Sequence, residues 1–202
     1  MHSIWQEKIE FPDYPILKSD KKADIVYLGA TLEHAVEAHF KQEQGKAVMI
    51  LEEKVISRKS ELGGMGILRS GNKKERKMLH QLRDYICGRQ IPCEMEVVSE
   101  DCLWIHPMKL FLFMTEEIPV YEQTSVQARL GKRLDIGCAY VDAAEIIEPR
   151  EKKEIIYVHV FSDKKYLEKE WKNIREIRRY KDVWLAGSLK RDLEGSQYFW
   201  EI

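Results

Sequence analysis

The stretch Asp24-Ile-Val-Tyr-Leu-Gly29 opens the segment that decides the fold. A short apolar run that ends in glycine is typical of a buried strand followed by a tight turn. Thr31 can then cap a helix that ends near Gly45, and Ala47-Val-Met-Ile-Leu51 has the pattern of a second buried strand. Residues 24–53 therefore predict a strand–helix–strand unit, whose two apolar strands are normally parallel and covered on both faces.

Further segments extend this pattern along the chain. Two segments share one order of residues, an acid followed by apolar residues and then small residues: Asp24 to Ala30 and Asp182 to Ser188. This shared order predicts that both are buried parallel strands. A polar loop is expected over residues 54–70. The other predicted elements are helices over Lys73–Cys87, Leu103–Thr115 (with Pro107 in the first turn) and Lys165–Arg179, and strands over Val120–Arg129, Cys138–Ala144, Ile155–Phe161 and Asp182–Gly187.

The fold class expected from this order is α/β. It is a Rossmann-like, mostly parallel sheet of about five strands with flanking helices and room for a small antiparallel portion. A chain of 202 residues is long enough for one sizeable core. We expect an irregular N-terminal lead-in over residues 1–23 and a single compact domain over residues 24–202.

Composition and charge exclude several classes of partner. Hydrophobic residues make up 44% and charged residues 33%, which is typical of a globular protein, and the net charge is −1. Basic clusters are interleaved with acids, so we expect no nucleic-acid binding. The apolar runs are too short to cross a bilayer, and the N-terminus lacks the pattern of a signal peptide. We therefore expect a cytoplasmic protein with no membrane contact.

Metal and disulfide chemistry are not indicated. The four cysteines form no Cys-x-x-Cys pair, and isolated cysteines in a cytosolic chain are usually small core residues. His34 and His39 are five residues apart, which on a helix places them on different faces. His159 lies inside a predicted strand and is expected to be structural, whereas His106 can be an acid–base group or a helix cap.

The turn after the first strand is the expected phosphate-binding position. A diphosphate sits at a helix N-terminus because the unpaired N–H groups and the helix dipole favour negative charge there. The motif Gly-x-Gly-x-x-Gly serves this purpose, but Gly29-Ala-Thr-Leu-Glu-His34 keeps only its first glycine. Thr31 and His34 occupy the other two glycine positions, and Glu33 adds a negative charge to the first helical turn. A βαβ unit with one glycine can also be a fold element only.

These parts together resemble the FAD-dependent oxidoreductases of the broad glutathione-reductase-like Rossmann group. The resemblance rests on the first strand and Gly29, on Val48-Met-Ile-Leu-Glu52, and on Leu62-Gly63-Gly64-Met65. Two later stretches are similar to further family strands, namely Tyr140-Val-Asp-Ala-Ala-Glu145 and Val183-Trp-Leu-Ala-Gly-Ser188. Ser188 stands where the family has an acid, and family members are far longer.

The resemblance implies a site for FAD. Glu52 would hold a ribose hydroxyl, and the cofactor would lie across Gly29, Thr31, Glu52 and Gly63-Gly64, with Ala143 and Gly187 lining the isoalloxazine side. Apart from the resemblance, Gly63-Gly64 and Gly66 can form a phosphate loop or a flexible turn. Nothing in the sequence identifies catalytic residues.

Three hypotheses about function follow, and the third, an NAD- or nucleotide-binding regulator, requires the same phosphate cradle as FAD. In the first, the chain is an FAD-dependent oxidoreductase-like protein that needs a second chain or a homodimer mate to complete its substrate site. In the second, it is a relative that has lost the cofactor and acts as a binding or assembly subunit. Fold alone does not fix function, so the reaction class rests on the resemblance.

Overall fold

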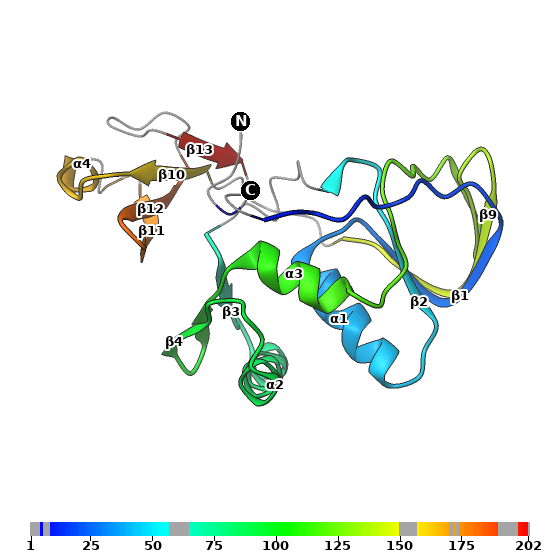
Figure 1. The fold of residues 1–202 in the computed structure, drawn as a ribbon, viewed down its shortest axis with the longest axis horizontal. Coiled ribbons are helices and arrows are strands. Elements are labelled where there is room, and N and C mark those ends of the chain that lie inside the picture. The colour runs from blue at the N-terminus through cyan, green and yellow to red at the C-terminus, as the bar shows by residue number, and fades with distance from the viewer. Residues whose placement is uncertain are drawn as a thin grey trace.

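The computed structural model describes residues 5, 9–56, 65–149, 157–169, 172, 174–189 and 198–201. Its largest sheet, here called sheet A, has six strands in the order β6-β2-β1-β9-β8-β7 (Figure 1). Four neighbouring strands of sheet A are parallel, and β8 and β7 extend it as an antiparallel edge. The strands are β1 (Lys21–Leu28), β2 (Val48–Leu51), β6 (Val120–Tyr121), β7 (Ala128–Leu130), β8 (Arg133–Asp135) and β9 (Tyr140–Ile147).

Two helices pack together against the sheet, α1 (Leu32–Glu43) and α3 (Pro107–Thr115). Both lie on the same face, where Tyr27 of β1 and Ile50 of β2 join the largest hydrophobic cluster. On the opposite face of sheet A, a second cluster brings Met49 and Val141 together with Leu134 of β8. Both faces of the parallel strands are therefore covered, as expected for a buried parallel sheet.

Two smaller antiparallel sheets complete the described fold. One has the order β3-β5-β4 and carries α2 nearby, and the other has the order β11-β12-β10-β13 and lies at the opposite end of the molecule from β9 (Figure 1). Their elements are β3 (Ile67–Arg69), α2 (Lys73–Arg89), β4 (Glu96–Ser99), β5 (Cys102–Trp104), β10 (Tyr157–Phe161), α4 (Lys165–Lys169), β11 (Ile174–Tyr180), β12 (Val183–Ser188) and β13 (Tyr198–Glu201).

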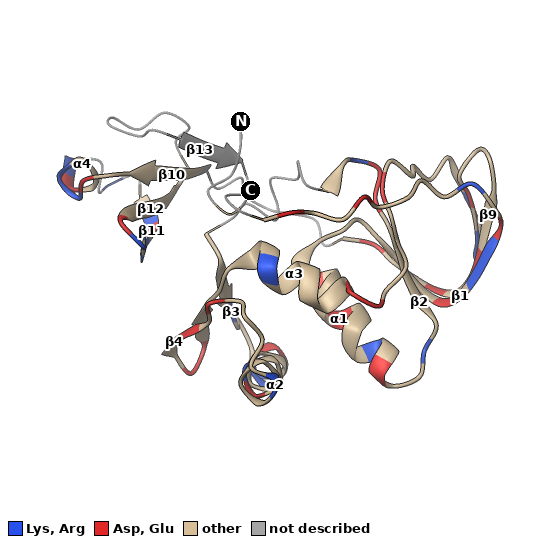
Figure 2. Ribbon diagram, in the orientation of Figure 1, with Lys and Arg blue, Asp and Glu red and all other residues tan. Residues whose placement is uncertain are grey.

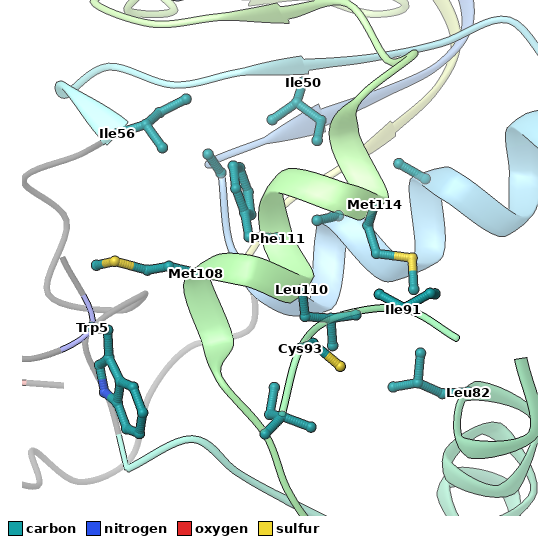
Figure 3. Packing of buried hydrophobic residues seen from close by; sticks show 14 of the residues in the cluster. Trp5, Ile50, Ile56, Leu82, Ile91, Cys93, Met108, Leu110, Phe111 and Met114 are labelled. Carbon is teal, nitrogen blue, oxygen red and sulfur yellow. The ribbon is translucent and has the colours of Figure 1, made fainter. Parts of the chain in front are cut away.

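One hydrophobic cluster connects sheet A to the small sheets. Phe111 and Met108 of α3 lie among side chains from β2, α1 and the N-terminal segment (Figure 3). Trp5 is fully buried in the same cluster, and Tyr180 of β11 packs against its ring. The N-terminal lead-in therefore contributes to the core, and the domain limits given above stay predictions.

The α/β class and the mostly parallel Rossmann-like sheet are confirmed. The first βαβ unit has the predicted elements, and Thr31 caps α1 by accepting the backbone N–H of His34. Charges of both signs share α2 and β11, as the interleaved sequence indicates (Figure 2). No helix within the described residues is long and apolar enough to cross a membrane.

Several predicted elements are wrong. The helix predicted over Lys165–Arg179 ends at Lys169, and its second half is strand β11. The helix predicted from Leu103 begins at Pro107, because Leu103 lies in strand β5. The strand predicted over Val120–Arg129 is interrupted between Tyr121 and Ala128, and the loop predicted over residues 54–70 contains β3.

The predicted likeness of the first and last strands is also wrong in one respect. Strand β12 is antiparallel to both β10 and β11, and it lies in a different sheet from β1. Its local composition matches that of β1 because both strands are buried. Composition says nothing about the direction of the neighbouring strand, and this accounts for the error.

Candidate functional site

A cavity of about 290 Å³ opens at the carboxyl edge of sheet A. It lies where β1 and β2 end, beside the segment after β6 and the residue Pro149 after β9. In open α/β sheets ligands bind at this edge, outside the carboxyl ends of the strands. Its walls are formed by Leu28, Gly29, Leu51, Glu52, Glu53, Lys54, Thr124, Val126 and Pro149.

Gly29 turns the chain out of β1 at the edge of this cavity. Its φ is +88°, a conformation that side chains with a Cβ rarely adopt. Its N–H donates to the Leu51 carbonyl oxygen at 2.7 Å, which ties the turn to the end of β2. Its own carbonyl oxygen accepts the N–H of Thr31 at 3.0 Å and lies 2.8 Å from Nδ1 of His34. The predicted glycine position is therefore a true left-handed turn.

Glu52 is the buried acid of the site, with a side chain that is only 2% exposed. Its Oε2 accepts the N–H of Ala30 at 2.7 Å, and its Oε1 accepts the N–H of Lys54 at 2.9 Å. The two bonds hold the carboxylate across the gap between the ends of β1 and β2. Its position fits the predicted ribose-binding role.

Side chains of the protein itself cap the N-terminus of α1 and supply a negative charge there. Thr31 Oγ1 accepts the N–H of His34 at 3.1 Å, as an N-cap does. Glu33 is the acidic residue of the first turn and is exposed. His34 is 3% exposed, and its ring lies 5.3 Å from the Tyr27 ring between α1 and β1. A histidine thus fills the place where the dinucleotide motif has its third glycine.

These residues fit the ribose of a dinucleotide but not its diphosphate. Glu52 fits a ribose diol. The diphosphate position has a capping threonine in place of a glycine, and Glu33, Glu52 and Glu53 outnumber Lys54 around it. A helix N-terminus favours one anion, and Glu33 already supplies that charge. The chain's own residues therefore do not fit a diphosphate as they stand.

The other residues predicted to contact the cofactor are spread over the fold. Gly63 and Gly64 lie outside the described residues. Ala143 is buried in the middle of β9, and Gly187 is in β12, paired with Val158 of the antiparallel sheet. The cavity walls include neither Ala143 nor Gly187 among the described residues. Their predicted contact with an isoalloxazine ring stays a prediction.

The two histidines singled out from the sequence have structural contacts. His106 caps α3, with its Nδ1 accepting the N–H of Lys109 at 3.4 Å, and burial lowers its pKa to about 4. His159 is fully buried in β10, and its Nε2 lies 3.0 Å from Ser188 Oγ in β12. Of the two roles predicted for His106, the structure therefore shows the helix cap. His159 is a buried residue that contacts the neighbouring strand.

Arg178 is a buried cation that the sequence does not reveal. It is 3% exposed, and its Nη1 donates to the carbonyl oxygens of Met65, Gly66 and Ile105. Its guanidinium carbon lies 5.2–5.5 Å from the ring centres of Trp5, Trp104 and Tyr180. Burial lowers the pKa of Arg178. It joins β11 to the β3–β5 region, but its sequence context is a run of charges that looks solvent-exposed.

Comparison with solved structures identifies the fold. Glycine oxidase from Bacillus cereus superposes with a TM-score of 0.63 at 11% identity, over 89% of this chain and 82% of that chain. This chain therefore shares the fold of that oxidase. L-amino acid deaminase from Proteus vulgaris matches 89% of this chain with a TM-score of 0.50 at 10% identity. PqsL, a probable FAD-dependent monooxygenase from Pseudomonas aeruginosa, matches 83% with a TM-score of 0.51 at 10% identity.

The extent of these matches differs. This chain spans 63% of the L-amino acid deaminase and 60% of PqsL, less than two thirds of either. No protein-family model matches the chain, and no curated protein matches its sequence. At identities of 10–11% the likeness establishes a shared fold alone, and the activity has to be argued from the site.

Proposed function

We propose that this chain is a cofactor-free relative of flavin-dependent oxidoreductases that acts as a binding or assembly subunit. The N-terminus of α1 carries this proposal. Thr31 takes the N–H of His34, and Glu33 supplies the negative charge that a diphosphate would supply. The His34 ring fills the space between α1 and β1. In this proposal the chain keeps the fold of its flavin-dependent relatives, but its own residues Thr31, Glu33 and His34 occupy the position where the phosphates of the cofactor would bind.

An exposed strand edge supports the role of a subunit. Strand β4 is the outer strand of its sheet, and its Val97 and Val98 are 51% and 47% exposed. The outward backbone N–H and C=O groups of an outer strand are a template for pairing with another chain, and exposed apolar side chains favour such pairing. Such an edge is usually protected in a protein that works alone.

A second candidate is an FAD-dependent oxidoreductase-like protein whose substrate site is completed by a second chain. Glu52 favours it, because a buried carboxylate fixed by two backbone N–H groups is prepared for a ribose. In that case the cofactor would be held at Gly29 and Glu52 and would supply the redox chemistry.

The visible absorption spectrum of the purified protein, followed by calorimetric titration with FAD, separates the two candidates. For the cofactor-free subunit we expect a colourless protein with no saturable FAD binding up to about 1 mM, which corresponds to about −4 kcal/mol. A flavin spectrum, or saturation well below that concentration, would overturn the proposal and establish the second candidate. Analytical ultracentrifugation of the same sample tests the subunit role, for which we expect association rather than a monomer.

A further inference from the structure

A chain of polar contacts joins three helices at the C-terminal ends of α1 and α2. Nδ1 of His39 in α1 lies 3.2 Å from the carbonyl oxygen of Met114 in α3, and its Nε2 lies 2.7 Å from the hydroxyl oxygen of Tyr85 in α2. The Tyr85 hydroxyl donates to Oε1 of Glu43, one turn further along α1, at 2.8 Å. These four residues, Met114, His39, Tyr85 and Glu43, are here called the His39 clamp.

The number of hydrogens in the His39 clamp fixes the charge of its imidazole. A carbonyl oxygen only accepts, so Nδ1 of His39 carries the hydrogen that bonds Met114. Tyr85 has one hydroxyl hydrogen, and its bond to the Glu43 carboxylate uses it. The hydrogen between His39 and Tyr85 then has to come from Nε2. With Glu43 ionised, all three bonds form together only when the ring carries both hydrogens and is a cation.

A neutral ring leaves the clamp one hydrogen short. If Nε2 of His39 accepts the hydroxyl hydrogen of Tyr85, the phenol oxygen and the Glu43 carboxylate face each other as two acceptors. If Tyr85 keeps its bond to Glu43, the phenol oxygen and Nε2 face each other in the same way. One of the two bonds to Tyr85 is therefore lost on deprotonation, whereas the edge contact of its ring with Phe40 is independent of protons.

The charges around the clamp favour the cationic ring. Glu43 lies 3.9 Å from Nε2 of His39 and pairs with Arg89 of α2 at 3.3 Å. Glu117, which follows α3, adds a second negative charge near Tyr85. Burial and the bond to Glu43 raise the pKa of Tyr85, so its hydroxyl keeps its hydrogen throughout the range in which histidine titrates. Two carboxylates and one guanidinium surround the clamp among the described residues, and a ring cation offsets that excess.

Helix α2 relays the clamp to another part of the fold. His80 Nε2 lies 2.9 Å from the carbonyl oxygen of Glu100, and Arg76 Nη2 donates to Asp101 at 2.8 Å. Both partners lie in the turn between β4 and β5. The same helix thus contacts α1 through the clamp and the β4–β5 turn through its N-terminal half.

We propose that His39 is a pH-sensitive clamp, which holds the C-terminal end of α2 against α1 and α3 when its ring is protonated and releases it as the pH rises. The cavity at the carboxyl edge of sheet A takes no part in it. The inference is therefore independent of whether the chain binds FAD.

Hydrogen exchange of the full chain tests the clamp at the backbone amides of residues 86–90, the last turns of α2. We expect their protection, corrected for intrinsic exchange, to be at least about threefold lower near pH 8.5 than near pH 5.5, because a hydrogen bond is lost. The amides of β9, which lies away from α2 (Figure 1), provide the reference. Unchanged protection in α2, or an equal change in β9, would overturn the proposal.

Glu43→Gln tests the hydrogen count itself. The amide nitrogen can donate to the Tyr85 oxygen, and the hydroxyl can then donate to a neutral His39, so the clamp no longer needs the extra proton. We expect protection of residues 86–90 in this variant to change by less than about 1.5-fold across the same pH range. Arg89→Gln is the matched control, because it removes the ion pair with Glu43 but none of the clamp hydrogens, and it should keep the pH dependence of the parent. The same pH dependence in Glu43→Gln as in the parent would contradict the proposal.

Tyr85→Phe removes the hydroxyl and keeps the ring. We expect low protection of residues 86–90 at both pH values, since neither bond to Tyr85 can form. Nitrogen-15 chemical shifts of the His39 ring, recorded over the same range in the parent, give the protonation state directly. We expect the loss of protection to follow deprotonation of this ring. Deprotonation of His39 without a change in α2, or a neutral ring where α2 is fully protected, would show that the clamp does not act as a switch.

Discussion

Gly66 lies where two polypeptide segments approach a buried cation. Its φ is +63°, and a Cβ there would fall within contact distance of the Ile105 carbonyl oxygen and of Arg178 Nη1. We expect Gly66→Ala to lower the free energy of unfolding by at least about 2 kcal/mol, because it adds backbone strain to a steric clash. Chemical denaturation measures the change. Gly88→Ala is the control, since Gly88 is helical and its Cβ would meet open space, so it should be neutral or stabilising by up to about 1 kcal/mol.

His106 makes stability depend on pH. Burial lowers its pKa from 6.5 to about 4, so the folded protein keeps it neutral where the unfolded chain is already protonated. Stability from this residue is full above pH 6.5 and is lost as the pH falls towards 4, by about 2–3 kcal/mol. Denaturation curves across this range should show the loss. His106→Asn retains a capping side chain but does not titrate, and a loss of equal size in that variant would assign the effect to other groups.

At the scale of elements, the sequence predicts the first βαβ unit well because several local signals agree there. The apolar strands, the Thr31 cap and the glycine turn all favour the same elements. Strand β11 could not be found in this way. Arg178 and Tyr180 are its buried residues, whereas Arg175 and Arg179 are exposed, so the inward face includes a charge. A run of charges without an apolar stripe favours a solvated helix, whereas in the structure β11 pairs with β12 and aromatic rings surround the buried Arg178.

The pairing of β10 with β12 includes a buried polar contact. His159 Nε2 and Ser188 Oγ lie 3.0 Å apart, and both side chains are fully buried. We expect Ser188→Ala to destabilise the protein by about 1–2 kcal/mol, because it removes a buried partner of the imidazole. Thermal unfolding followed by circular dichroism gives the comparison. The exposed Ser162, which follows β10, provides the control: Ser162→Ala should change stability by less than about 0.5 kcal/mol. Equal effects of the two changes would show that the buried contact adds nothing.

At the scale of the whole molecule, the candidate site was only partly predictable. One βαβ unit contains Gly29, Thr31 and Glu52 at the ends of its elements, and the fold of that unit brings them together. Thr124, Val126 and Pro149 complete the cavity from segments far along the chain, and no local pattern marks them. The hydrogen bond from Ala30 to Glu52 joins residues 22 positions apart and depends on how β1 and β2 pair. The geometry of the candidate site therefore depends on the tertiary fold as much as on its motif.

The same reasoning predicts that FAD binding can be restored. If Thr31 and Glu33 exclude a diphosphate, the double variant Thr31→Gly, Glu33→Ala should bind FAD at least about tenfold more tightly than the parent chain, a gain of about 1.4 kcal/mol. Glycine is an acceptable N-cap, so α1 should remain folded, and calorimetric titration measures the affinity. Thr31→Ser keeps the capping hydroxyl and should bind FAD no better than the parent. If the parent and the double variant bind FAD equally well, the α1 terminus is not what excludes the cofactor, and the residues around Glu52 would have to account for the specificity of the whole site.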